Sequence, residues 1–191
     1  MAKHVICDVE KRFIFLNGDI FFITFTLIEN YLKELTAIDA NRLVNFYINS
    51  TGGDFYASLQ ICHLLRRVPV TINTIAVDFA KSGGLLILQT GEKRFSTNET
   101  SLGFHMAKVT KDSIENIFKT TDNDVNSRIL MELAQELFLI DAQQMIILGE
   151  RGRPISKIKK LFSRNAEITA QQALKLNLID GILPKSKIPK I

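Results

Sequence analysis

Ser82 and His105 are the residues in this sequence whose types and spacing could perform nucleophilic catalysis. They lie 23 positions apart, and a glycine pair, Gly52 and Gly53, precedes both of them. A serine can attack a carbonyl carbon, a histidine can accept the hydroxyl proton, and backbone N–H groups in a glycine turn can stabilise the resulting oxyanion. The three features together predict acyl transfer.

Ser82 lies in a turn of small residues, Ala80-Lys81-Ser82-Gly83-Gly84, directly before an apolar run that begins at Leu85. Small neighbours permit a tight strand-to-helix turn in which the hydroxyl is exposed and the next N–H is free. The alternative is that Ser82 only caps the helix that follows it.

The histidine and the glycine pair also have alternative interpretations. His105 follows an apolar stretch and can be a structural residue; as a general base it must reach the Ser82 hydroxyl and be held by a third polar group. The glycine pair can be an ordinary turn with positive φ. In the functional interpretation, the N–H groups of Gly53 and Gly83 form an oxyanion hole. His4 and His63 have no comparable context, so we interpret them as structural.

Short apolar runs alternate with helical patterns in the first half of the chain. Strands are predicted at 12–16, 43–48, 69–77, 93–95 and 101–105, and helices at 27–35, 55–65 and from 85 onward. This order predicts an α/β core with right-handed crossovers. Both glycine turns then fall where a strand ends and a helix begins, which is the sheet edge at which ligand sites gather.

The second half has a different character, because residues 111–147 show no strand-like alternation. An apolar stripe at helical spacing predicts a long helix or helical hairpin that projects from the core. The stripe consists of Ile129, Leu130, Leu133, Leu137 and Ile140. A long helix with apolar residues to spare needs a neighbour to cover it, so we expect an oligomer.

Composition narrows the class of protein. A chain of 191 residues that is 46% hydrophobic can form one domain with a large core. The formal charge is +4, but basic residues cluster only at 157–164 and 185–190 without interleaved aromatics, which argues against nucleic-acid binding. No apolar run is long enough to predict a membrane span. Two cysteines, Cys7 and Cys62, fit neither a disulfide framework nor a zinc motif, so we expect a cytoplasmic protein without metal or cofactor.

These features resemble the proteolytic subunit of the Clp protease (ClpP), a family of self-compartmentalised serine peptidases. Residues 49–53 are similar to the family's N-S-P-G-G, residues 81–85 to its nucleophile motif A-S-M-G-A, and Arg94-Phe95 with the later His105 to its R-F…H stretch. Residues 12–18 and 173–183 also resemble the family's opening and closing patterns. The likeness therefore runs from about Arg12 to Leu183.

The resemblance implies an α/β fold, a ClpP/crotonase-like spiral of βαβ units with a projecting handle helix. It implies a single ClpP-like domain over 1–191, with a short N-terminal segment (1–11), a helical handle region (about 111–147) and a basic tail (184–191). Within the handle region, residues 118–140 would join two rings. Ser82 would be the nucleophile, His105 the general base, and Gly53 and Gly83 the oxyanion hole.

Several positions depart from the family pattern. The family's catalytic aspartate falls on Asn165, which can orient a histidine but cannot stabilise an imidazolium with a charge. Thr51 replaces a proline, and Lys81 replaces a small residue, where it could obstruct the nucleophile. The segment before Arg12 and the loop at 91–94 are short. These differences indicate a divergent paralogue whose activity is weakened or conditional.

The first functional hypothesis is a serine-type endopeptidase subunit. By family likeness it would form stacked heptameric rings, receive unfolded protein or peptide from an AAA+ unfoldase, and need no cofactor. The second is a catalytically impaired ClpP-like paralogue that acts as a structural or regulatory ring subunit. A third is a crotonase-like acyl-CoA enzyme, for which Ser82 and His105 would be coincidental.

Overall fold

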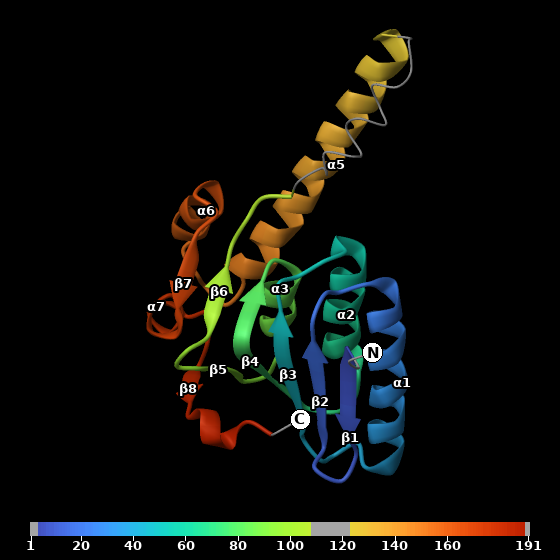
Figure 1. Ribbon diagram of the computed structural model, residues 1–191, viewed down its shortest axis with the longest axis vertical. Helices are drawn as coiled ribbons and strands as arrows, with labels where there is room; N and C mark the ends of the chain where they lie inside the picture. Colours follow the sequence, from blue (N-terminus) through green and yellow to red (C-terminus); the bar gives the residue numbers. More distant parts are fainter. Residues whose placement is uncertain (1–3, 108–122, 190–191) are drawn as a thin grey trace.

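A computed structural model describes residues 4–107 and 123–189, and its centre is one eight-stranded sheet (Figure 1). The strands run in the order β1-β2-β3-β4-β5-β8, while β6 pairs with β4, and β7 pairs with β6. β1 and β7 are antiparallel to their neighbours, and the other pairings are parallel. The strands are β1 (Val5–Asp8), β2 (Phe13–Asn17), β3 (Val44–Ser50), β4 (Ile72–Lys81), β5 (Arg94–Thr97), β6 (Ser101–Gly103), β7 (Glu167–Thr169) and β8 (Gly181–Leu183).

Six α-helices and one short 3-10 helix connect the strands of the described residues. They are α1 (Phe22–Ile38), α2 (Phe55–Arg67), α3 (Gly83–Leu88), α5 (Asn123–Gly149), α6 (Ile155–Ser163), α7 (Ala170–Lys175) and the 3-10 helix η1 (Lys185–Lys187). Parallel strands with helical connections confirm the predicted α/β class.

Side chains alternate between the two faces of the sheet with a period of two residues. In β2, Ile14 and Leu16 belong to the larger core, whereas Phe13 and Phe15 belong to a smaller cluster. The larger core lies between the sheet and the helices, and the smaller cluster is partly covered by the C-terminal segment.

A buried ion pair holds the C-terminal part of the chain against β5. The guanidinium of Arg94, which is 1% exposed, donates from Nη2 and Nε to the two oxygens of Asp180 at 2.7 and 3.0 Å. Its Nη1 donates to Gln89 Oε1 and to the carbonyl of Asn177. Because Asp180 precedes β8, this network fixes the last strand at the edge of the sheet.

α5 projects away from the sheet in Figure 1, as the predicted handle helix does. Two contacts join α5 and the residue after it to α2. Tyr56 Oη donates to Glu136 at 2.9 Å, and Arg66 pairs at 2.7 Å with Glu150, which directly follows α5. The predicted apolar stripe is half-buried, whereas other large apolar side chains of α5 are exposed. The exposed ones are Met131, Phe138, Leu139 and Ile146. No described helix is long and apolar enough to cross a membrane.

Several predicted boundaries differ from the observed ones. β4 begins at Ile72 instead of residue 69 and continues to Lys81, so that it ends directly before the candidate nucleophile. β6 ends at Gly103, which places His105 beyond the strand. β1 lies within the predicted N-terminal segment 1–11 and was not predicted, because four residues have too little pattern to indicate a strand without a partner. Residues 111–122 of the predicted handle region lie outside the described residues.

Candidate active site

Ser82 occupies the single position between β4 and α3, with φ 50° and ψ −122°. A residue with a Cβ rarely adopts this conformation, and holding it there costs about 1–3 kcal/mol. The Ser82 side chain makes no capping hydrogen bond with α3. Ser82 is the N-cap residue of α3 by its backbone, but its side chain does not cap the helix. The turn resembles the strained strand-to-helix turn that exposes a nucleophilic serine.

The two glycine turns meet at this serine. A Cβ added to Gly52, whose φ is 105°, would lie 2.7 Å from Ser82 Cβ and 3.2 Å from the amide nitrogen of Gly83. Gly53, the next residue, lies beside the backbone of Ile20. The Ile20 N–H donates to the Gly52 carbonyl, and the Ile20 carbonyl accepts from the Asp54 N–H. Within residues 4–107 and 123–189, the N–H groups of Gly53 and Gly83 have no hydrogen-bond acceptor. Two unpaired backbone donors therefore lie near Ser82, at the ends of different strands.

The chain leading to His105 runs beside the end of β4, because β6 pairs with β4 and Gly103 lies opposite Lys81. The Ser82 N–H donates to the Gly103 carbonyl at 3.1 Å, and His105 follows two residues later. His105 Nδ1 lies 2.9 Å from the carbonyl oxygen of Met106. Because a carbonyl only accepts, Nδ1 carries the proton, and Nε2 of the neutral ring has a free lone pair. This is the tautomer that a general base needs, although no hydrogen bond joins His105 to Ser82 in the described part of the chain.

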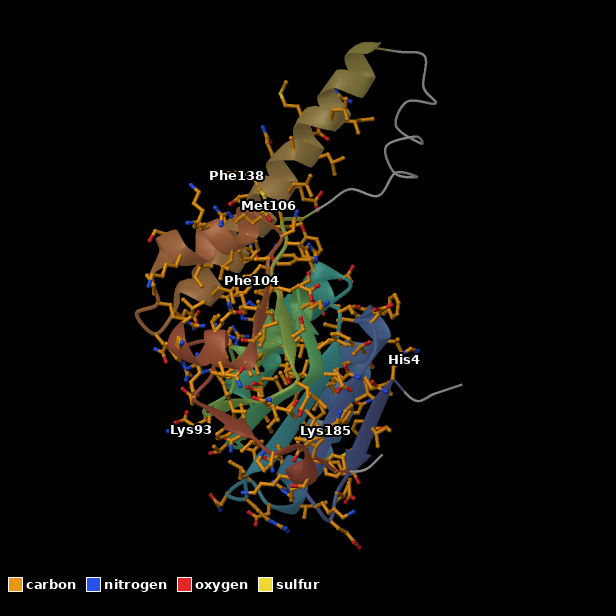
Figure 2. The ribbon with its side chains drawn as sticks, turned by 60° about the vertical axis from the view of Figure 1, so that its left-hand side comes forward. His4, Lys93, Phe104, Met106, Phe138 and Lys185 are labelled. Atoms are coloured by element: carbon orange, nitrogen blue, oxygen red, sulfur yellow. The ribbon has the colours of Figure 1, made fainter. Side chains whose placement is uncertain are left out.

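Asn165 lies just beyond the end of the β6–β7 ladder, as His105 does. The antiparallel register pairs Gly103 with Glu167, the Phe104 N–H donates to the Ala166 carbonyl at 2.9 Å, and Asn165, with φ 46°, lies in the turn before β7. His105 and Asn165 line one cavity of about 380 Å³. Figure 2 labels Phe104 and Met106 on the segment that leads from β6 toward α5. No hydrogen bond between Asn165 and His105 is present among the described residues.

The structure adds an ion pair to this cavity that sequence reasoning missed. Lys81 Nζ lies 2.6 Å from Glu167 Oε1, and Ser101 Oγ donates to Glu167 Oε2 at 2.6 Å. Both hydrogen bonds hold the pKa of the Glu167 carboxyl below its ordinary value, and the bond from Lys81 has the larger effect. The Lys81 ammonium also lies 4.9 Å from the centre of the Phe79 ring. Glu167 was missed because β7 has three residues, too few to predict a strand or its partner.

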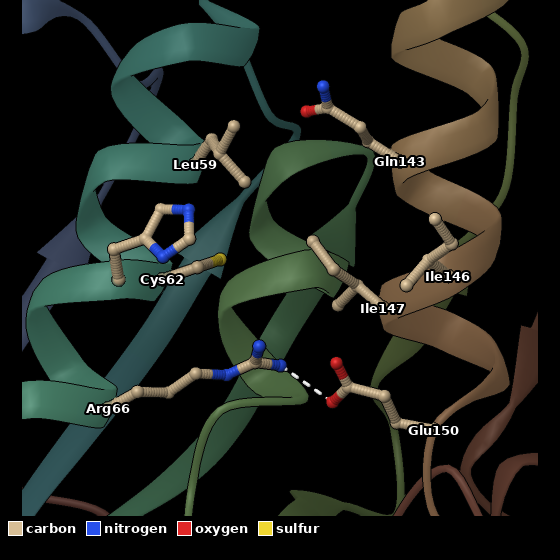
Figure 3. Close-up of a pocket in the computed structure, with 8 residues that line it drawn as sticks. Leu59, Cys62, Arg66, Gln143, Ile146, Ile147 and Glu150 are labelled. Atoms are coloured by element: carbon tan, nitrogen blue, oxygen red, sulfur yellow. Dashed lines mark hydrogen bonds and ion pairs between the residues drawn. The ribbon is translucent and has the colours of Figure 1, made fainter.

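A second cavity, of about 310 Å³, lies between α2 and α5 (Figure 3). The ion pair between Arg66 and Glu150 spans its two walls, and Cys62 lies on the α2 side. Burial raises the pKa of the Cys62 thiol to about 12, which makes it a poor nucleophile at neutral pH. The described residues contain no group of three or more His, Cys, Asp or Glu side chains that could hold a metal ion. The cavity beside His105 is therefore the stronger candidate for chemistry.

Comparison with known proteins gives one family for nearly the whole chain. A family model described as Clp protease matches residues 4–186. The chain is also similar to the ATP-dependent Clp protease proteolytic subunit of Porphyromonas gingivalis, with 27% identity over 178 residues that cover 92% of this chain and 75% of the relative. The fold, the glycine turns and this match agree with the resemblance found in the sequence. The chain belongs to the Clp protease family.

Proposed function

We propose that this chain is a serine-type endopeptidase subunit with Ser82 as nucleophile, His105 as general base, and the N–H groups of Gly53 and Gly83 as oxyanion hole. The backbone of Ser82 is the observation that carries the proposal. A serine in an unfavourable conformation (φ 50°, ψ −122°), without a capping hydrogen bond, has no evident structural role. Strain of this kind persists where the surrounding structure imposes it, and it is concentrated at active sites.

The proposed reaction has two steps. Ser82 Oγ attacks the peptide carbonyl carbon while Nε2 of His105 takes the hydroxyl proton. The tetrahedral oxyanion accepts hydrogen bonds from Gly53 and Gly83, each worth about 3 kcal/mol in the barrier. The C–N bond then breaks as His105 gives its proton to the leaving amine. Water, activated by the same ring nitrogen, hydrolyses the acyl ester and regenerates Ser82.

We further propose a single ClpP-like domain over 1–191 that assembles into homo-oligomeric rings. The exposed apolar residues of α5 support assembly, because an isolated helix rarely leaves several large apolar side chains in water. The Porphyromonas gingivalis relative is described as a proteolytic subunit of an ATP-dependent protease. By this likeness we propose stacked heptameric rings, unfolded protein as substrate, an AAA+ unfoldase as partner and a cytoplasmic location.

A catalytically impaired ring subunit is the second candidate, and specific observations favour it. Asn165 provides no charge for the imidazolium, and among the described residues no hydrogen bond joins His105 to Ser82 or to Asn165. The family match favours both candidates over acyl-CoA chemistry.

A fluorophosphonate probe separates these candidates, because it reacts only with an activated serine. We expect the full-length protein to be labelled at Ser82, and the Ser82→Ala variant not to be. Ser186→Ala is a matched control on the exposed 3-10 helix η1 and should be labelled like the wild type. Labelling of neither wild type nor control, in a folded protein, would support the impaired subunit. Tight binding of a CoA thioester would instead favour a crotonase-like activity.

A further inference from the structure

Lys81 reaches across β6 to Glu167, although the two residues lie on strands that do not pair with each other. Lys81 ends β4 and Glu167 begins β7, and both are paired in register with Gly103 of the intervening β6. A Cβ added to Gly103 would lie within 2.7–3.0 Å of the Lys81 side-chain carbons, so the lysine stem crosses directly over this glycine. The ion pair therefore spans three neighbouring strands.

The two residues of this ion pair line the same cavity as His105 and Asn165. The hydrogen bonds from Lys81 and Ser101 occupy both oxygens of Glu167, so its carboxylate has a defined position despite the exposure of the side chain. The Lys81 side chain itself is only 21% exposed. A carboxylate and an ammonium are thus held beside the candidate base.

We propose that Glu167, held by Lys81 and Ser101, is a positioning residue that supplies the negative charge beside His105 which Asn165 does not provide. Lys81 has two effects in this arrangement. It fixes the carboxylate, and its own charge opposes protonation of the imidazole. The inference takes the role of His105 from the proposed function, but the effect of the two charges on the ring does not depend on catalysis.

Charged groups on other elements also face this segment. Asp141 of α5 accepts a hydrogen bond from the Ala107 N–H at 2.8 Å, two residues from His105. Arg164, at the C-terminal cap of α6, precedes Asn165. These two charges are unchanged when Lys81 or Glu167 is substituted, so the ion pair can be tested against a constant background.

The test follows the imidazole ring of His105 by NMR as a function of pH, in the full-length protein. The signal is assigned with a His105→Gln variant, and the exposed His4 and His63 serve as internal controls. We expect Glu167→Gln to shift the titration midpoint of His105 downward and Lys81→Met to shift it upward, each on the order of half a unit. The double variant should return near the wild-type midpoint.

A merely structural ion pair gives a different result. Loss of either partner would then disturb the same packing, so both single variants would change His105 in the same direction or not at all. Either outcome overturns the proposal. If a single variant unfolds, the charge-reversed double variant Lys81→Glu/Glu167→Lys retains an ion pair and should still shift the midpoint.

Labelling by the fluorophosphonate provides a second readout. If Ser82 is activated by His105, the acid limb of the labelling rate against pH should move with the NMR midpoint in each variant. Unlabelled wild-type protein would contradict the proposed function, whereas opposite NMR shifts in that protein would still support the role of Glu167. Parallel NMR shifts together with normal labelling would overturn the role of Glu167 and leave the peptidase proposal intact.

Discussion

Asn165 and His105 line one cavity, yet Nδ1 of His105 is hydrogen-bonded to the carbonyl of Met106 at 2.9 Å. The backbone carbonyl thus sets the tautomer, a task that the third residue of a serine peptidase triad usually performs. Position 165 contributes no negative charge, so an aspartate there would add to the charge that we propose Glu167 supplies. Because the tautomer is already set by the backbone, a carboxylate restored at position 165 would change only the charge beside the imidazole.

Asn165→Asp is expected to raise the rate of fluorophosphonate labelling on the order of tenfold, corresponding to about 1.4 kcal/mol. The gain is smaller than the about 10⁴ known for a trypsin-type triad, because there most of the loss comes from the wrong tautomer. The φ of 46° at Asn165 is accessible to aspartate. Asn177→Asp is the matched control, since Asn177 has φ 58° outside the cavity and its substitution should leave the rate unchanged. An unchanged rate in Asn165→Asp would contradict the proposed need for charge.

Ser82→Gly is expected to be more stable than Ser82→Ala by about 1 kcal/mol, because glycine adopts the observed backbone conformation without steric strain. Urea denaturation of the two variants measures this difference. At Ser156, in the first turn of α6, the order should reverse, because glycine is less favourable than alanine in a helix. If the alanine variant is the more stable one at position 82, the turn is not strained.

Asp180→Asn is expected to lower the free energy of unfolding by about 2–3 kcal/mol at neutral pH, since it leaves the buried Arg94 without its carboxylate. Hydrogen bonds from Arg94 hold the pKa of Asp180 below its ordinary value. The stabilisation is therefore present above the unfolded pKa of about 3.9 and is lost as the pH falls through the lower folded value.

Urea midpoints at about pH 7 and about pH 3 measure this dependence. The urea midpoints of the wild type and of Asp180→Asn should lie closer together at the lower pH. Asp78→Asn is the control, because Asp78 pairs at 3.2 Å with Lys185 in an exposed ion pair, and such a pair is worth about 0–1 kcal/mol. A difference for Asp180→Asn that stays constant with pH would show that the lost stability does not come from the carboxylate charge.

Phe138→Glu is expected to reduce the mass of the assembly without unfolding the protein. Phe138 is 71% exposed on α5 (Figure 2), so burial against another subunit is the proposed reason for an aromatic residue there. Analytical ultracentrifugation measures the mass, and circular dichroism measures the fold. Gln135→Glu introduces the same charge at another exposed position of α5 and should leave the mass unchanged. A monomeric wild-type protein would contradict the proposed assembly.

Local sequence pattern was sufficient for the elements with strong periodicity. The apolar run within 12–16, ended by the turn signal Asn17-Gly18, predicted β2, and the glycine turns at Gly52–Gly53 and Gly83–Gly84 predicted where strands end and helices begin. These features depend on neighbours in the chain, because a strand's faces and a turn's allowed φ are local properties. The α/β class and the family resemblance followed from them, and both are confirmed.

Tertiary structure decided which of these residues meet. Strand pairing places Asn165 and Glu167 beside His105, although about sixty residues separate them, because β6 is parallel to β4 and antiparallel to β7. Three-residue strands have too few side chains to specify a partner or a register by pattern alone, so the Lys81–Glu167 ion pair could not be predicted. Residue types and local spacing were enough to identify the candidate catalytic groups. Which residues lie beside them was decided by strand pairing, because register depends on contacts between segments that are distant in the sequence.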